Sequence, residues 1–293
     1  MKIFKHSIFA TALLALSALS CDKAESPVSM PELSETLTYS VELDQQTKAL
    51  GEGKSINYIW CGAYKEVNND GVVSYTLRSE SLTPFVDGIA QCKIEMVRDQ
   101  SYKVVFVGQY FENMNPEPRP SYWIDEGFAR VYMPTANDAT APATNSDNYD
   151  LFTYVDQVTD FRPRAAKNIT LARRVAQINF LADPADLATS AIAGKTPEQS
   201  SVTLTGVPEY ISLLDGTVSD TFVDVQYARA PLTNLYENTL ATVFCLASET
   251  SKDVNASLYI YNANGETLKE YSSIPGIPYK ANYRTNVKVS YKF

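Results

Sequence analysis

Side chains able to carry out chemistry are few in this chain of 293 residues. Its single histidine, His6, lies in the apolar start of the sequence, so the rest lacks the base of Ser-His-Asp and Cys-His catalysis and every histidine ligand for zinc. Carboxylate pairs such as Asp125 and Glu126 are what remains for a glycosidase-like reaction. Adjacent acids in a loop are usually just solvated, and no further chemical group assembles around these two. We therefore expect no enzyme, no catalytic residues and no metal site.

The start of the sequence has the composition of a secretory signal. Lys2 and Lys5 form a basic start, an apolar stretch follows, and small residues lead into Cys21. A cysteine directly after Ala-Leu-Ser resembles the bacterial lipobox, in which cleavage before the cysteine is coupled to lipid attachment on its sulfur. We expect residues 1–20 to be removed and Cys21 to carry lipid, which anchors stably because each buried CH₂ contributes about 0.8 kcal/mol. Ordinary secretion, with cleavage at the same small residues, is the alternative.

The charge balance is acidic, with 25 Lys and Arg against 34 Asp and Glu and a net charge of −9. Loss of Lys2 and Lys5 with the signal makes it more acidic. This balance argues against a nucleic-acid partner and against adsorption on anionic lipid headgroups, since both require basic side chains. An acidic surface that resists aggregation is sufficient to explain it. No cofactor is expected apart from the covalent lipid on Cys21.

Three cysteines follow the one that would carry lipid. They are Cys61, Cys92 and Cys245, an odd number that cannot pair completely within one chain. Cys61 and Cys92 both fall in expected strands of the first half, so an oxidising compartment could join them. Buried free thiols that behave as small apolar side chains are the alternative.

Alternation of apolar and polar residues predicts strands through most of the chain. A polar, proline-containing stretch over residues 21–35 is interpreted as a tether, and the first strand follows over 36–44. Only residues 183–194 have a helical pattern, with Asp183 as the cap. The apolar face of the first strand consists of Leu37, Tyr39, Val41 and Leu43.

Turn sequences divide these strands into short units. Residues 68–71 (Asn-Asn-Asp-Gly) and 263–265 (Ala-Asn-Gly) each separate two β-rich runs and predict hairpins. Many short strands at this spacing favour an all-β fold of β-sandwiches. We expect an N-terminal domain over 36–168 and a C-terminal domain over 169–293.

The end of the chain has the sharpest alternation. A strand patterned in this way is specified to bury one face. It either closes its own sheet or adds to the sheet of another subunit. The residues of this face are Tyr283, Thr285, Val287, Val289, Tyr291 and Phe293.

Several segments, taken in order, resemble one family. They are the lipobox-type start, NYDLFTYV (148–155), ITLARRVAQINF (169–180), SVTLTGVPEYISLLDG (201–216) and IPYKANYRTNVKVSYKF (277–293). Together they are similar to the fimbrillin superfamily of type V pilus subunits in Bacteroidota, in a lipoprotein branch classed as a domain of unknown function.

The resemblance implies two tandem transthyretin-like or Ig-like β-sandwich domains on a lipoprotein that reaches the outer surface. In the family, a trypsin-like protease cuts after the first strand, and the C-terminal strand of the next subunit fills the resulting groove. Carried over to this chain, the processing candidates are Lys48 and Lys54, and the donor candidate is 283–293.

Two departures from the family pattern favour an anchor, tip or accessory subunit over a shaft subunit. Shaft subunits are usually cut after arginine, and no arginine lies between Cys21 and Arg78. They also commonly continue beyond the strand that here ends at Phe293. The resemblance thus implies other pilus subunits, the outer membrane and a host or bacterial surface ligand as partners, with a place at the cell surface or in the fimbria.

The alternative function is a stand-alone surface lipoprotein that binds glycan or peptide ligands. Aromatic residues gather around the proline-rich loop at 112–122, and aromatic platforms suit sugar rings. Packing in the core is the competing explanation for such side chains. The residues concerned are Tyr110, Phe111, Tyr122, Trp123, Phe128 and Tyr132.

Overall fold

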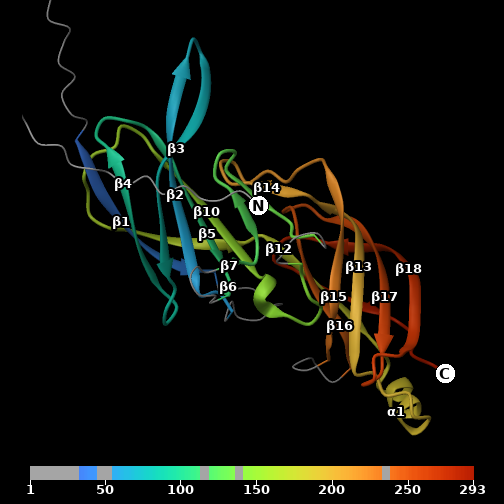
Figure 1. Cartoon of the computed structure of the whole chain (residues 1–293). Helices are drawn as coiled ribbons and strands as arrows, with labels where there is room; N and C mark the ends of the chain where they lie inside the picture. Colours follow the sequence, from blue (N-terminus) through green and yellow to red (C-terminus); the bar gives the residue numbers. More distant parts are fainter. Residues whose placement is uncertain (1–32, 45–54, 113–118, 136–140, 233–237) are drawn as a thin grey trace, which may run out of the picture. The chain divides into compact units, whose positions relative to one another are not determined.

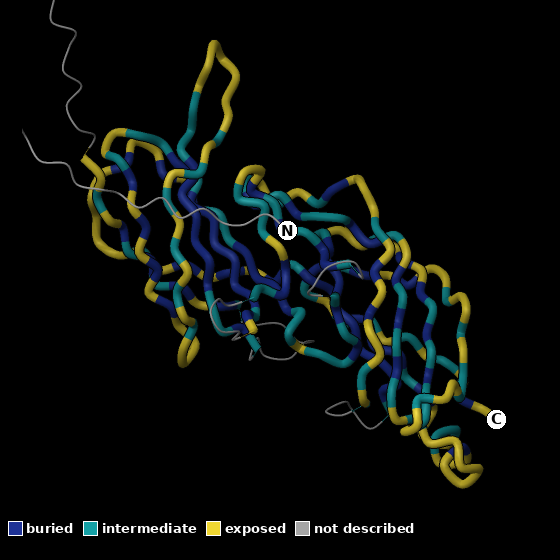
Figure 2. Tube along the Cα trace, in the orientation of Figure 1, coloured by how far each residue is buried: buried dark blue, intermediate teal, exposed yellow. Residues whose placement is uncertain are grey.

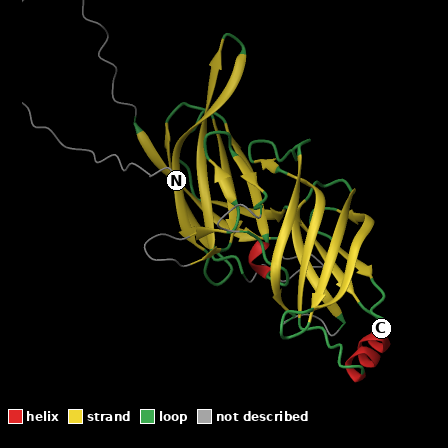
Figure 3. Cartoon of the chain, turned by 45° about the vertical axis from the view of Figure 1, so that its right-hand side comes forward, coloured by secondary structure: helices red, strands yellow, loops and turns green. Residues whose placement is uncertain are grey.

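Strands account for nearly all of the regular structure in the computed structural model (Figure 1). The structure describes residues 33–44, 55–112, 119–135, 141–232 and 238–293. Within this part, helix is confined to α1 (Pro184–Ile192) and a 3-10 turn, η1 (Asp147–Tyr149) (Figure 3). The all-β class predicted from the sequence is confirmed. No helix of the described residues is both long and apolar enough to span a membrane.

The largest sheet has seven strands in the order β3-β2-β5-β10-β11-β1-β4. Neighbouring strands pair antiparallel except β1 and β11, which run parallel. The edge strands β3 and β4 approach each other where the Ser79 hydroxyl donates to the Glu95 carbonyl at 2.6 Å, so the sheet is nearly closed. Its strands are β1 (Ser34–Leu43), β2 (Tyr58–Asn69), β3 (Val72–Pro84), β4 (Ala90–Val97), β5 (Tyr102–Gln109), β10 (Leu151–Val158) and β11 (Lys167–Arg173).

The inward side chains of this sheet form one apolar cluster. Leu37, Tyr39 and Val41 on β1 pack there with Phe106 on β5 and Phe152 on β10. The rings of Tyr39 and Phe106 meet edge to face, with centroids 4.8 Å apart. The period-two pattern read from the first strand therefore corresponds to its buried face.

The second half of the chain forms a three-stranded sheet, β16-β12-β19, and a four-stranded sheet, β15-β13-β17-β18. Buried residues of both sheets, such as Phe180 on β12 and Leu204 on β13, belong to one core. Figure 2 shows buried and exposed positions alternating along these strands. Their bounds are β12 (Val175–Leu181), β13 (Gln199–Pro208), β15 (Phe222–Pro231), β16 (Thr239–Leu246), β17 (Lys252–Tyr261), β18 (Thr267–Tyr279) and β19 (Arg284–Lys288).

A small sheet joins the two halves of the sequence. It has the order β14-β9-β8, with β14 (Tyr210–Ser212), β9 (Arg130–Tyr132) and β8 (Trp123–Asp125). A further short pair is β6 (Phe111–Glu112) with β7 (Arg119–Pro120). Because β14 pairs with β9, residues about eighty positions apart in the chain share one sheet.

The turns and the helix form where the sequence predicts them. Asp70 and Gly71, at φ of 52° and 87°, form the turn of the β2–β3 hairpin, which projects beyond its neighbours in Figure 1. Gly265, at φ of 81°, lies in the turn between β17 and β18, where a residue with a Cβ would be strained. Asp183 caps α1 by accepting a hydrogen bond from the Ala185 amide at 2.8 Å.

A buried ion pair lies where the chain passes from one group of sheets to the next. Arg173, the last residue of β11, donates from Nε and from a terminal guanidinium nitrogen to the two carboxylate oxygens of Asp150, both at 2.8 Å. Both side chains are buried, and the guanidinium lies over the Phe152 ring at 4.7 Å. Strand β11 ends at Arg173 and β12 begins at Val175, so the chain changes sheet at Arg174.

We predict that Asp150→Asn lowers the free energy of unfolding by about 3–5 kcal/mol, because it leaves the buried Arg173 charge without its counter-charge. Urea unfolding followed by circular dichroism measures the change. Asp147→Asn, which alters an exposed neighbour, is the matched control and should stay within about 0.5 kcal/mol of the parent. Equal stability of the two variants would contradict a structural role for the ion pair.

Candidate functional site

The candidate site consists of the two terminal strands, beginning with β1. This strand lies between β4, with Tyr39 opposite Cys92, and β11, with Val41 opposite Ile169. Tyr39 and Val41 are 0% exposed. Because β1 has a neighbour on each side, removing it would leave two rows of unpaired backbone groups and an apolar slot between them.

A hydrogen-bonded network fixes β1 at its centre. The Tyr39 hydroxyl donates to Asp156 Oδ2 at 2.9 Å, and Lys167 Nζ donates to Oδ1 of the same carboxylate at 2.6 Å. Arg164 lies 3.7 Å from Asp156 Oδ2. Burial, reinforced by the Asp156 carboxylate, raises the pKa of Tyr39 far above its ordinary value, so the hydroxyl remains a donor. Sequence reasoning missed Asp156 and Lys167, since no local pattern relates them to Tyr39.

The C-terminal segment differs from β1 in its pairing. Its strand β19 runs parallel to β12, from Gln177 opposite Arg284 to Leu181 opposite Lys288, and it is the edge strand of its sheet. Only one row of its backbone groups is paired with a neighbouring strand.

The predicted apolar face of this segment is only partly buried. Tyr291 is 0% exposed, whereas Tyr283 and Phe293 are 55% and 54% exposed. Thr285, Val287 and Val289 are half-buried. The prediction of one buried face along the whole segment is therefore wrong at its two ends. Tyr283 precedes β19 and Phe293 follows it by several residues, so neither lies within the paired strand.

Side-chain contacts dock the segment onto its own sheets. The Tyr291 hydroxyl donates to the Lys195 carbonyl at 3.1 Å, and the Ser190 hydroxyl of α1 donates to the Tyr291 carbonyl at 2.9 Å. Asn179 Nδ2 donates to Asn286 Oδ1 at 3.0 Å. Of the two possibilities left open by the sequence, the segment closes its own sheet in this structure.

The three cysteines of the described residues are free and buried. Cys61 and Cys92 belong to the same apolar cluster, and burial together with the neighbouring Cys92 raises the pKa of the Cys61 thiol well above its ordinary value. Burial raises the pKa of Cys245 to about 12. Cys61 and Cys92 are both present as buried free thiols in this structure.

The remaining residues singled out in the sequence lie in different parts of the chain. Cys21, Lys48 and Lys54 lie outside the described residues. Asp125 Oδ1 accepts hydrogen bonds from the amides that follow it, at 3.1 and 3.2 Å, and so has a turn-forming role. Partial burial and the Glu80 carboxylate raise the pKa of Glu126. Asp125 thus holds a turn, whereas the Glu126 carboxyl lies near the Glu80 carboxylate.

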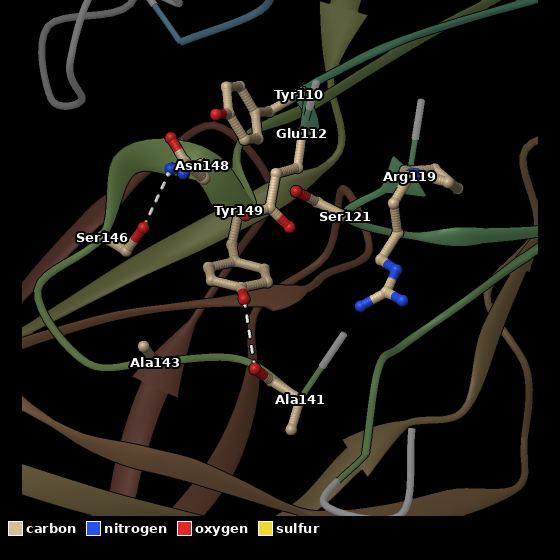
Figure 4. Close-up of a pocket in the computed structure, with 10 residues that line it drawn as sticks. Tyr110, Glu112, Arg119, Ser121, Ala141, Ala143, Ser146, Asn148 and Tyr149 are labelled. Carbon is tan, nitrogen blue, oxygen red and sulfur yellow. Dashed lines mark hydrogen bonds between the residues drawn. The ribbon is translucent and has the colours of Figure 1, made fainter. Parts of the chain in front are cut away.

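The aromatic residues of the binding alternative divide into two groups. Phe111 and Tyr122 are core residues, 6% and 0% exposed, whereas Trp123 and Phe128 are 58% and 68% exposed. Tyr110 borders a cavity of about 330 Å³ that is shown in Figure 4. The other walls of this cavity are mainly polar and include Glu112, Arg119, Ser121, Asn148 and Tyr149.

These features define an all-β protein in which the first and last strands of the described residues, β1 and β19, are both paired with neighbouring strands. Residues 28–290 match the model of a family of unknown function (DUF6562), and the chain belongs to that family. Membership of a domain-of-unknown-function family, predicted from the sequence resemblance, is thereby confirmed. No curated protein matches the chain.

Several solved structures are similar to this chain, and three of them illustrate the likeness. A candidate adhesin from Bacteroides ovatus is 10% identical and covers 90% of each chain, with a TM-score of 0.45. A fimbrial assembly protein from Parabacteroides distasonis is 13% identical over 88% of this chain and 92% of its own, with a TM-score of 0.42. The fimbrial anchor protein Mfa2 from Porphyromonas gingivalis is 15% identical over 80% and 82%, with a TM-score of 0.43. At TM-scores below 0.5 we draw nothing about function from these likenesses.

We predict that Tyr39→Phe lowers the free energy of unfolding by about 1–3 kcal/mol, because Asp156 loses a buried donor to its carboxylate. Tyr154→Phe on β10, whose hydroxyl lies outside this network, is the control and should change little. Urea unfolding measures both variants. A loss of stability that is the same in both would show that the Tyr39 hydroxyl does not fix β1.

Proposed function

We propose that this chain is a fimbrillin-like surface lipoprotein, anchored by lipid on Cys21, that serves as a structural and adhesive component of a type V pilus. The lipobox-type start and the ordered series of family-like segments support this proposal. We assign the chain a terminal position in the pilus (anchor, tip or accessory subunit) at the outer membrane, with other pilus subunits as its partners. The role is one of scaffolding and adhesion, without catalysis.

In this proposal the chain consists of two tandem transthyretin-like β-sandwich domains. The seven-stranded sheet supplies the N-terminal domain, and the sheets built from β12 onward supply the C-terminal domain. We place the boundary between them after β11, near the residue 168 expected from the sequence, because β11 pairs with β1 and β10. The small sheet containing β8, β9 and β14 would connect the two domains.

The choice of a terminal role rests on one observation: β1 is paired on both sides, whereas β19 is paired on one side only. Any cut at Lys48 or Lys54 would separate both Cys21 and β1 from the rest of the chain, so a subunit that releases β1 also loses its lipid. Since β1 is buried and paired on both sides, its retention is favoured. A subunit that keeps β1 has no empty slot, and its remaining strand for exchange is β19.

Exchange of β19 is energetically reasonable. In its own sheet β19 pairs on one side only, whereas a slot left by a missing first strand offers partners on both sides. Its face repeats the pattern of β1, with Val287, Val289 and Tyr291 matching the alternation of Leu37 to Leu43. The docking contacts of Tyr291 must be released first, so we infer that β19 leaves its sheet only when an acceptor is present.

We predict that Cys21→Ala abolishes incorporation of labelled palmitate and releases assembled pili into the culture medium, because an anchor without lipid no longer holds its filament. Immunoblots of cell and medium fractions against the major pilus subunit give the result. Ser20→Ala keeps the cysteine and is the control. Pili that stay on the cells would indicate a tip or accessory subunit, and a pilus unaffected even by deletion of the whole chain would contradict any pilus role.

We also predict that cutting the chain between Lys48 and Lys54, at an inserted site for a specific protease, leaves the β1 fragment bound. The buried face of β1 and its pairing on both sides should hold it without a covalent link. Native mass spectrometry should give the uncut mass, and denaturing conditions should give two fragments. As a control, the same site placed within residues 22–32 removes the tether only. Spontaneous loss of β1 with formation of SDS-resistant ladders would instead identify a shaft subunit.

A further inference from the structure

The small sheet of β8, β9 and β14 has two unlike faces. Its strands pair so that Ile124, Val131 and Ile211 stand in one row, and this row packs into the core, with Val131 and Ile211 0% exposed. Because successive side chains on a strand point to opposite faces, the next row must point outward.

That outward row is entirely aromatic. Trp123, Tyr132 and Tyr210 are register partners on the three strands. The ring centroids of Trp123 and Tyr132 are 5.0 Å apart, and those of Tyr132 and Tyr210 are 5.4 Å apart. Trp123 is 58% exposed, and Tyr132 and Tyr210 are half-buried. A large exposed ring beside two further rings makes an aromatic patch, which is the kind of surface that marks a binding site.

Polar groups stand beside the aromatic row. Arg130, two residues from Tyr132 on β9, lies over the Tyr210 ring at 4.2 Å and over the Phe128 ring at 5.3 Å. Its register partner is Asp125, whose carboxylate holds the turn that displays Phe128. Rings for stacking and groups for hydrogen bonding therefore alternate over a few residues.

Hydrogen bonds hold the backbone that carries these rings. The Ala129 carbonyl, in the turn after β8, accepts a hydrogen bond from the Leu213 amide at 2.7 Å. Directly after β9, the Met133 amide donates to the Glu209 carbonyl at 2.8 Å. A backbone held in this way loses little conformational entropy on binding.

We propose that this outward face, defined by Trp123, Phe128, Arg130, Tyr132 and Tyr210, binds a neutral oligosaccharide. The exposed Trp123 ring would stack on the apolar face of a pyranose unit. The Arg130 guanidinium, which lies over the Tyr210 and Phe128 rings, would donate hydrogen bonds to its hydroxyls. This goes beyond the pilus role, because binding by the purified chain requires neither lipid nor strand exchange.

Other occupants fit this face less well. Strands of three residues each are too short to provide the roughly 800 Å² per partner of a stable protein interface. A polyanion such as nucleic acid would meet Arg130 alone on this face, beside Asp125 and Glu126 and on a chain of net charge −9. A neutral chain of sugar rings needs only a narrow strip and no excess of positive charge.

The test uses the full mature chain and a panel of neutral hexasaccharides, namely cellohexaose, chitohexaose, xylohexaose and mannohexaose, with a hyaluronan hexamer as the anionic comparison. Saturation-transfer NMR and titration calorimetry measure binding. At least one neutral hexasaccharide should bind, and Trp123→Ala should weaken it about tenfold or more. Trp123→Tyr, which keeps a ring, should retain most of the affinity.

Ile192→Ala is the control, since Ile192 is 90% exposed on α1, which lies at the other end of these sheets from β14 (Figure 1). It should bind like the parent, and all variants should share the parent's unfolding midpoint. Absence of binding to every neutral hexasaccharide, preference for the anionic one, or equal binding by Trp123→Ala would overturn the proposal. Pilus attachment, scored separately with Cys21→Ala, does not depend on this result.

Discussion

The pairing of β1 between β4 and β11 is the interaction on which the rest of the structure depends. It completes the seven-stranded sheet, places Leu37, Tyr39 and Val41 in the first core, and brings Tyr39 to the carboxylate of Asp156. Without β1 the sheet would have two new edges and an open apolar slot, a state that is costly in water. The integrity of the N-terminal half is therefore tied to a strand at the very start of the described chain.

Strands β1 and β19 are both held by strand pairing, but they differ in the number of neighbouring strands. β1 is paired on both sides and buried, whereas β19 is paired on one side and carries exposed aromatic residues near both of its ends. This asymmetry is the physical basis of the proposed role, in which the first strand is kept and the last strand is the one that can be exchanged. In strand addition generally, main-chain hydrogen bonds join the partners and alternate side chains set specificity.

The small sheet of β8, β9 and β14 shows how one element serves stability and recognition together. Its inner row is apolar and packs into the core, and its outer row is aromatic, with Trp123 exposed and Tyr132 and Tyr210 half-buried. The inner row is anchored in the core and the turn is tied to Leu213, so the backbone that carries the outer rings is held in place. The same arrangement explains why Tyr122 is buried whereas its neighbour in sequence, Trp123, is exposed. Successive side chains on a strand point to opposite faces.

Local sequence alone determined the β class, the hairpins at Asp70-Gly71 and Asn264-Gly265, the Asp183 cap and the buried face of the first strand, because each depends on neighbours within a few residues. Only the tertiary structure decided that β1 runs parallel to β11, that Arg173 ends the first sheet, and that Tyr210 joins Trp123 and Tyr132 in one row. These contacts join segments far apart in the chain. A period-two pattern states which face a strand buries, but it carries no information about which strand lies beside it.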